Sequence, residues 1–179
     1  MIQDRLAQLE QAAVSVIELL RGASRPEDVA LASIERLGLA AASEWAAYWM
    51  LVPKQRRVRP LAIWSVSGPK VQLPARHPPQ TVSDSESTAT HVWRNQKPVW
   101  ATSTVAQGAP RTLEDPQGDL QSGVWFAVKT DTAVYGVIEL LGRAFAPRTT
   151  ANLAVIERLG ARLGHALEER RRNFPPRPH

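Results

Sequence analysis

The chain of 179 residues contains no cysteine. This absence excludes disulfide bonds, thiolate catalysis, cysteine-ligated zinc and iron–sulfur clusters. No apolar run approaches the roughly 18 to 20 residues that cross a bilayer, and the first residues lack the pattern of a secretory signal peptide. We therefore expect no membrane insertion and, by default, a cytoplasmic location.

Motifs that carry common chemistries are also missing. Neither Gly-x-x-x-x-Gly-Lys nor Gly-x-Gly-x-x-Gly occurs, so no glycine-rich phosphate loop is expected. No Gly-x-Ser-x-Gly turn presents a serine nucleophile, and no third ligand completes a metal site. The sequence thus predicts no catalytic residue and no metal, and the protein is not expected to be an enzyme.

Acidic residues are absent between Glu44 and Asp84, where six basic residues account for the whole net charge of +5. Four of these basic residues form a candidate basic patch around an expected turn: Lys54, Arg56, Arg57 and Arg59. Such a cluster attracts phosphates or acidic partners, although a solvated basic turn is the plainer interpretation. Nucleic acid is disfavoured, because the aromatic residues lie in apolar strands and do not alternate with the basic ones.

Apolar residues make up 44% of the chain and charged residues 22%, which suits one globular domain with a real core. Helical periodicity predicts four helices: 2–21, about 24–42, 86–96 and 148–173. Segments rich in aromatic and β-branched residues predict five strands: 44–52, 58–66, 99–101, 122–129 and 133–142. Two stretches rich in Pro, Ser or Gly predict loops: 67–83 and 103–120.

This order of elements predicts an α+β domain. Consecutive strands joined by short turns form hairpins, so the sheet is expected to be antiparallel, with helices covering it. Residues 1–22 are expected to form a separate helix for dimerisation and signalling, residues 23–173 the domain, and residues 174–179 a disordered tail.

The terminal helices both carry an apolar stripe. The residues of a candidate dimer seam are Leu6, Leu9 and Val16 in the first helix and Leu163 and Leu167 in the last. A symmetric bundle with a second copy would cover both stripes, so a homodimer is expected.

Tryptophan is frequent, with six residues. Trp45 and Trp49 are four apart on an expected strand and therefore point to one face. With Trp64 and Trp125 on other strands and His91 on the short helix, they make a candidate ligand pocket. The alternative is that the indoles fill the core, because aromatic side chains bury large areas, and that His91 is only a partly exposed residue.

Several segments, in this order, resemble the GAF family of bacterial sensory domains. They are EWAAYWML (44–51), HVWRNQKPVW (91–100), the pair SGVWFAV (122–128) and YGVIEL (135–140), and LGARLGHALE (159–168). The resemblance implies an antiparallel sheet of about five to six strands with helices on both faces. It also implies a small-molecule pocket on one face and a dimer that signals through its terminal helices.

The sequence also departs from parts of the family. Bilin-binding and methionine-sulfoxide-reducing members depend on cysteine, so bilin attachment through cysteine and that reduction are both excluded here. Ser83–Thr88 replaces the glycines that many members have before the short helix, and the sequence leaves the cofactor unknown. We expect a non-enzymatic sensor or regulatory domain that binds a small molecule and signals to a partner protein. The alternative is a ligand-free interaction module that uses the basic residues at 54–59.

Overall fold

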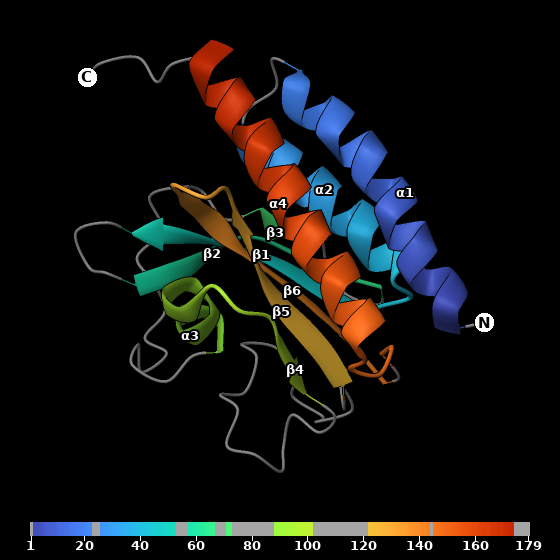
Figure 1. The fold of residues 1–179 in the computed structure, drawn as a ribbon. Helices are drawn as coiled ribbons and strands as arrows, with labels where there is room; N and C mark the ends of the chain where they lie inside the picture. Colours follow the sequence, from blue (N-terminus) through green and yellow to red (C-terminus); the bar gives the residue numbers. More distant parts are fainter. Residues whose placement is uncertain are drawn as a thin grey trace.

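The computed structural model describes residues 2–22, 26–52, 57–66, 71–72, 88–101, 122–143 and 145–173. Its helices are α1 (Ile2–Arg21), α2 (Pro26–Ala40), α3 (Thr88–Asn95) and α4 (Thr150–Asn173). Its strands are β1 (Trp45–Val52), β2 (Arg57–Ser65), β3 (Val71–Gln72), β4 (Val99–Ala101), β5 (Ser122–Lys129) and β6 (Val134–Gly142). Figure 1 shows these elements as a sheet with helices on both sides.

The six strands form one sheet in the order β3-β2-β1-β6-β5-β4, and all neighbouring pairs are antiparallel. Two hairpins, β1–β2 and β5–β6, meet at its centre because β6 pairs with β1. The predicted fold class, an α+β domain with an antiparallel sheet, is therefore confirmed. Strand β3 lies inside the segment predicted to be a loop, so that prediction missed a short edge strand.

The helices divide between the two faces of the sheet. Helices α1, α2 and α4 form a layer over one side, which we call the helical face, and α3 packs on the opposite side, the α3 face (Figure 1). Helix α1 lies against α2 and α4. No helix in the described part of the chain is long and apolar enough to cross a membrane.

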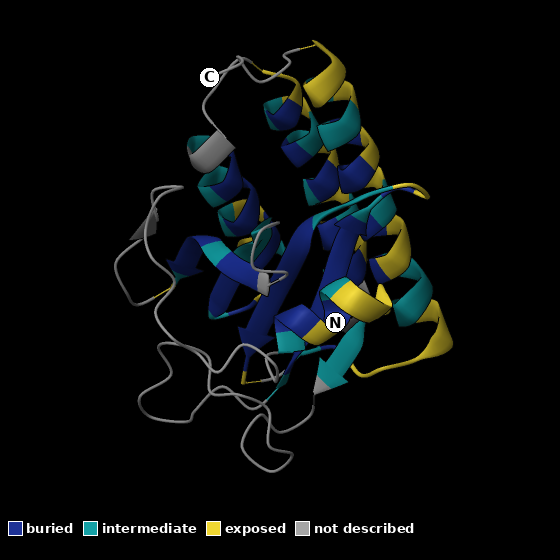
Figure 2. Cartoon of the chain, turned by 90° about the vertical axis from the view of Figure 1, so that its left-hand side faces the viewer, coloured by how far each residue is buried: buried dark blue, intermediate teal, exposed yellow. Residues whose placement is uncertain are grey.

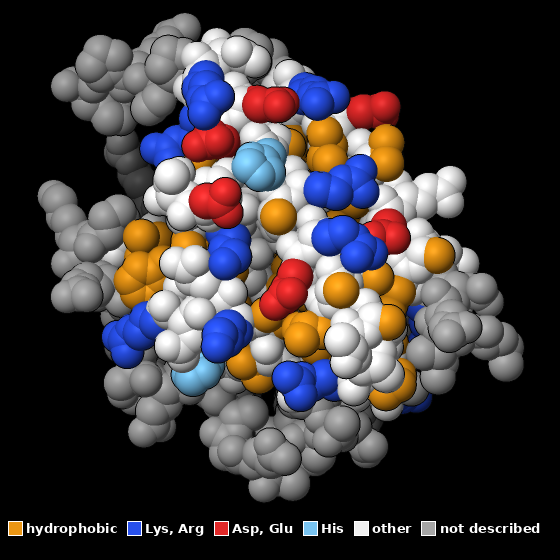
Figure 3. Space-filling view, in the orientation of Figure 1, with side chains coloured by type: hydrophobic (Ala, Val, Ile, Leu, Met, Phe, Trp, Pro, Cys, Tyr) orange, Lys and Arg blue, Asp and Glu red, His pale blue; other side chains and the backbone are white. Residues whose placement is uncertain are grey.

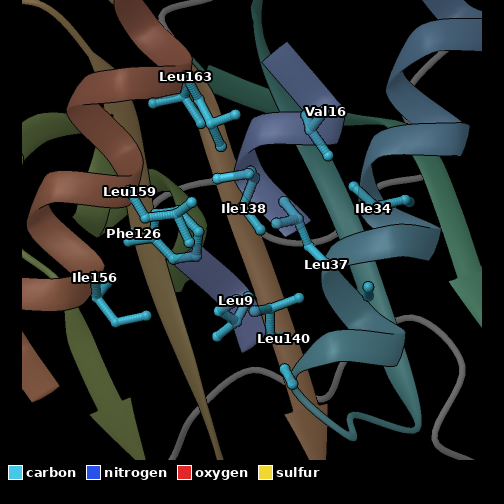
Figure 4. Packing of buried hydrophobic residues seen from close by; sticks show 14 of the residues in the cluster. Leu9, Val16, Ile34, Leu37, Phe126, Ile138, Leu140, Ile156, Leu159 and Leu163 are labelled. Atoms are coloured by element: carbon cyan, nitrogen blue, oxygen red, sulfur yellow. The ribbon is translucent and has the colours of Figure 1, made fainter. Parts of the chain in front are cut away.

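The larger core lies on the helical face (Figure 4). Three helices and two strands contribute its central side chains: Leu9, Val16, Ile34, Leu37, Phe126, Ile138, Leu140, Ile156, Leu159 and Leu163. Each is at most 2% exposed. Full burial of an aliphatic or aromatic side chain stabilises a fold by about 1.5–3 kcal/mol, so this layer holds the helices to the sheet.

This core corrects the predicted dimer seam. Leu6, Leu9, Val16 and Leu163 are between 0 and 4% exposed within a single chain, and Leu167 is half-buried against the same cluster. The stripes on α1 and α4 face each other, α2 and the sheet, and are already covered. Leu6, Leu9, Val16 and Leu163 are thus unavailable for contact with a second copy, whereas Leu167 stays partly exposed.

Two glycines let α4 lie very close to β5. A Cβ atom added to Gly160 would meet the carbonyl oxygen of Ala127, and one added to Gly164 would meet the carbonyl oxygen of Lys129. Any larger residue would push the helix away from the strand. The LGARLG segment therefore fixes the distance between the last helix and the sheet.

Candidate functional site

A glutamate lies in the middle of the sheet, on the α3 face. Glu139 is in β6, where it pairs with Ala47 of β1 on one side and Trp125 of β5 on the other. Its side chain is only 1% exposed. An isolated carboxylate is costly to bury, so its surroundings need a physical explanation.

Three indoles surround this carboxyl group. Trp45 and Trp49 stand two residues before and after Ala47 in β1, and alternation along a strand puts all three on the face of Glu139. Trp125 is directly opposite Glu139 in β5. The structure thus brings together three of the four tryptophans expected in a pocket. We call Trp45, Trp49, Trp125 and Glu139 the Trp–Glu cluster.

The polar atoms of the cluster are only partly paired. The Nε1 atom of Trp49 donates a hydrogen bond to Oε2 of Glu139 at 2.7 Å. The other carboxyl oxygen, Oε1, is buried without a hydrogen-bond partner, and so is Nε1 of Trp45. Buried polar atoms in native proteins nearly always have partners. The cluster thus has one free acceptor, Oε1 of Glu139, and one free donor, Nε1 of Trp45. A bound molecule with a donor and an acceptor would satisfy both.

Burial raises the pKa of Glu139 to about 7, because an apolar setting penalises the charged form. Hydrogen bonding from the indoles of Trp49 and Trp125 lowers the pKa in part. No neighbouring cation is among the causes of the shift. The carboxyl group therefore changes its charge near neutral pH, a property typical of functional sites.

Apolar side chains enclose the Trp–Glu cluster. The strands contribute Ala47, Val58, Ile63, Ala127, Val137 and Leu141, and α3 contributes Ala89 and Val92. Of the described elements, α3 alone covers this face (Figure 2). Trp49 of the cluster itself is only partly buried, and so are three further apolar side chains at the margin: Trp93, Val99 and Val134. The enclosure is thus apolar, with its polar atoms concentrated at Glu139.

Trp64 does not belong to this site. It pairs with Ala46, which points to the helical face, and its ring lies beside Gly38 of α2. Directly paired residues share a face of a sheet, and a shift of one residue in the pairing exchanges the two faces. The register of β1 and β2 therefore separates Trp64 from Trp45 and Trp49.

His91 is also outside the site. It lies on α3 with an exposed side chain, and its ring nitrogens are 3.0 and 3.2 Å from Nδ2 of Asn95, one turn later in the helix. The structure thus places His91 on the solvent side of α3, away from the Trp–Glu cluster. Within the described ranges, no three His, Asp or Glu side chains gather as metal ligands.

The predicted basic patch is only partly within the described residues. Lys54, Arg56 and the side chain of Arg57 lie outside them. Arg59 is described and is only 7% exposed, with Nη2 located 3.5 Å from Sδ of Met50. A buried guanidinium adds no exposed charge, so Arg59 does not form part of a surface patch.

Sequence reasoning missed Glu139 as a site residue. The available signal was one acidic residue in the otherwise apolar strand VYGVIELLG. Because β6 lies between two other strands, an acidic side chain in it either faces solvent or is buried for a functional reason. The sequence alone does not say which, since it does not show that α3 packs on that face.

Comparison with solved structures shows a GAF-like fold. The chain is similar to free methionine-R-sulfoxide reductase from Neisseria meningitidis, solved with its substrate, at 10% identity and TM-score 0.70, covering 96% of this chain and 95% of that one. It is similar to the GAF domain of Acinetobacter phosphoenolpyruvate-protein phosphotransferase, at 14% identity and TM-score 0.64, covering 93% and 95%. It is also similar to the GAF domain of a sensor histidine kinase from Bacillus halodurans, at 14% identity and TM-score 0.57, covering 82% and 96%.

No family model and no curated protein sequence matches the chain. The likeness to the solved structures extends over most of each chain but at low identity, and so it concerns the fold. The resemblance seen in the sequence segments is therefore confirmed at the level of architecture.

Proposed function

We propose that this chain is a non-enzymatic sensor or regulatory domain of GAF type that binds a small molecule on the α3 face. The proposal rests on one observation: the buried carboxyl group of Glu139 has a free oxygen and stands among three indoles. Ligand sites are typically apolar enclosures with a few polar groups that orient the ligand. The Trp–Glu cluster has that composition.

Several of the compared structures support a sensor or regulatory function. Several structural neighbours are GAF domains of signalling or phosphotransfer proteins, and three others are methionine-R-sulfoxide reductases, two of them solved with substrate. Reduction of methionine sulfoxide through a thiol is unavailable to this chain, because it contains no cysteine. What the reductases share with the chain is a fold that can hold a small molecule.

Strand β5 connects the Trp–Glu cluster to helix α4. Trp125 lies on the α3 face of this strand, and the carbonyl groups of Ala127 and Lys129 adjoin Gly160 and Gly164 of α4. A close, rigid contact transmits small displacements better than a loosely packed one. We infer that ligand occupancy shifts α4 through β5.

Helices α1 and α4 would carry this signal as a pair. Arg158 and Glu10 form an ion pair of 2.8 Å between them, and Arg21 and Glu169 form a second one of 3.5 Å. The outer surface of the helices mixes both charges with apolar side chains (Figure 3), and Val14 of α1 is 48% exposed there. We propose that this outer surface contacts a second copy or a signalling partner. Light scattering at micromolar concentration tests the homodimer, and a monomer mass would overturn it.

Native mass spectrometry tests ligand binding. Wild type, Glu139→Gln and the control Glu157→Gln, which changes an exposed residue of α4, are purified mildly and mixed with a panel of cationic, neutral and anionic metabolites. We expect wild type and the control to retain at least one small molecule that Glu139→Gln loses. If no compound of any charge binds to wild type, the proposal is wrong.

A further inference from the structure

We infer that the free carboxyl oxygen of Glu139 binds a protonated amine, so that the ligand is a small organic ammonium ion. This inference rests on the proposed function and specifies the ligand class of the same site. It follows from the unused hydrogen-bonding capacity of the Trp–Glu cluster and from the charges around it.

The carboxyl group of Glu139 uses only part of its hydrogen-bonding capacity. Oε2 of Glu139 accepts the bond from Trp49, and Oε1 is buried with no partner. An ionised carboxyl group only accepts hydrogen bonds, so the missing partner must be a donor. An ammonium group brings three N–H donors together with a positive charge, and such charge-assisted bonds are about twice as strong as neutral ones.

The described elements around Glu139 supply no counter-charge. Several charged or titratable side chains on the neighbouring described elements point elsewhere. His91 and Arg94 of α3 are exposed, Lys129 of β5 contacts Gln96 at 3.3 Å, and Arg59 of β2 contacts Met50 on the helical face.

Two tyrosines in β1 and β6 also point away from Glu139. The hydroxyl group of Tyr48 in β1 donates to the carbonyl oxygen of Tyr135 in β6, and both tyrosines pack against the core of the helical face. Glu139 therefore lacks a cation from the described part of its own chain. A nearby opposite charge favours the ionised form of a buried carboxyl group, and a cationic ligand would supply one.

Trp45 and the apolar neighbours of Glu139 indicate what the rest of the ligand is like. Nε1 of Trp45 is a second buried group without a partner, and it donates. An acceptor atom on the same ligand would satisfy it. The side chains packed around these groups are otherwise apolar, with Val92 and Trp125 among them. The cluster thus suits an amine that carries a hydrocarbon or aromatic body and at most a few further polar atoms.

Binding should depend on pH in a defined direction. Burial raises the pKa of Glu139 to about 7 in the free protein, whereas aliphatic amines stay protonated well above that pH. The ammonium ion binds the ionised carboxylate, so affinity should increase by up to about tenfold per pH unit below 7 and level off above it. A ligand that binds the neutral acid would show the opposite trend.

The test follows the indole N–H signals in ¹H–¹⁵N NMR spectra during titration with matched probes. The ammonium ions are n-butylammonium, cyclohexylammonium and 2-phenylethylammonium. The neutral controls are 1-butanol, cyclohexanol and 2-phenylethanol, and butyrate is the anionic control. We expect at least one ammonium ion to shift the signals of Trp45 and Trp49 saturably, with several-fold lower Kd at pH 8 than at pH 6. Each matched alcohol should bind at least tenfold more weakly.

Variants complete the test. Glu139→Gln should abolish binding of the ammonium ion, whereas Glu157→Gln should leave it unchanged. Trp49→Phe retains the carboxyl group, so it should still bind while the pH dependence moves to higher pH. This second variant keeps the test valid if Glu139→Gln does not fold.

The outcomes separate this inference from the proposed function. If only neutral or anionic compounds shift the signals, or if Glu139→Gln binds the ammonium ion as wild type does, the ammonium inference is overturned and the proposed function stands. If neither these probes nor the metabolite panel shifts any signal from the α3 face, both are overturned.

Discussion

The indole nitrogen of Trp49 and a carboxyl oxygen of Glu139 lie 2.7 Å apart, and this hydrogen bond joins the two central strands on the α3 face. The distance is in the short range found for bonds to ionised acceptors. It orients the carboxyl group and leaves its other oxygen free. The predictions about pH, stability and binding start from this pair.

Glu139 should make the stability of the protein depend on pH. Its pKa is raised from 4.5 to about 7 by burial, so between these values the folded state binds more protons than the unfolded state. The free energy of unfolding should therefore fall as pH rises from about 4.5 to 7, by at most about 1.4 kcal/mol per pH unit. Below pH 4.5 the stabilising contribution of Glu139 is fully present, and above about pH 7 it is completely lost.

Urea unfolding at several pH values checks this dependence. In Glu139→Gln the side chain cannot ionise, so this residue no longer lowers the stability as the pH rises. Wild type should therefore lose stability relative to the variant toward higher pH. Glu157→Gln, at an exposed position of α4, controls for the other carboxyl groups. If the free energy of unfolding changed with pH in the same way in wild type and Glu139→Gln, the pH dependence would not come from Glu139.

Trp49→Phe should raise the pKa of Glu139 further. The hydrogen bond from Trp49 lowers that pKa, and phenylalanine cannot donate one. The loss of a hydrogen bond to a charged group should also destabilise the ionised protein by about 1.5–3 kcal/mol. The ¹³C signal of the Glu139 carboxyl carbon measures the shift. Trp93→Phe is the control, since Trp93 packs at the margin of the same cluster, and an equal shift there would count against the Trp49 contact.

Leu9→Ala should unfold the protein more easily without first separating two copies. Leu9 is 0% exposed in the core of the helical face, and truncation of a buried leucine costs about 2–5 kcal/mol. Val14→Ala, on the exposed side of the same helix, should change stability by less than about 0.5 kcal/mol. Urea unfolding measures the stability of each variant, and light scattering measures whether it is a monomer or a dimer. If Leu9→Ala dissociated a dimer without changing the stability of the chain, Leu9 would belong to the dimer seam predicted from the sequence.

Gly164→Ala should destabilise the protein although alanine favours helices. In an unobstructed helix this change gains about 1 kcal/mol, but here the new methyl group meets the backbone of Lys129. We expect a lower midpoint of thermal unfolding. Gly142→Ala is the matched control, because its added methyl group would meet its nearest atoms at 3.6 Å, an ordinary contact. A stabilised Gly164→Ala variant would show that α4 is not held against β5.

The helices and most strands could be predicted from local patterns. The apolar periodicity of α1 gave its limits, and the polar turns gave the two hairpins, because these signals involve residues close in sequence. The shared face of Trp45 and Trp49 followed from strand alternation in the same way. These features do not depend on which elements pack together.

The failures share a different physical cause, since each involves contacts between distant segments. Trp64 depends on the register between β1 and β2, and a single-residue shift would have reversed its face. The periodicity of Leu9 and Val16 reveals an apolar stripe but not whether α2 and the sheet or a second copy covers it. Glu139 became recognisable only when β1, β5 and α3 were placed around it.

The most direct measurement follows the indole N–H signals of wild type as the metabolite panel is added. Trp45, Trp49 and Trp125 report on the α3 face, whereas Trp64 and Trp100 pack on the helical face and serve as internal references. We predict that at least one compound shifts the three α3-face signals saturably and leaves the two reference signals in place. Shifts confined to Trp64 and Trp100, or no shift with any compound, would contradict a ligand site built around Glu139.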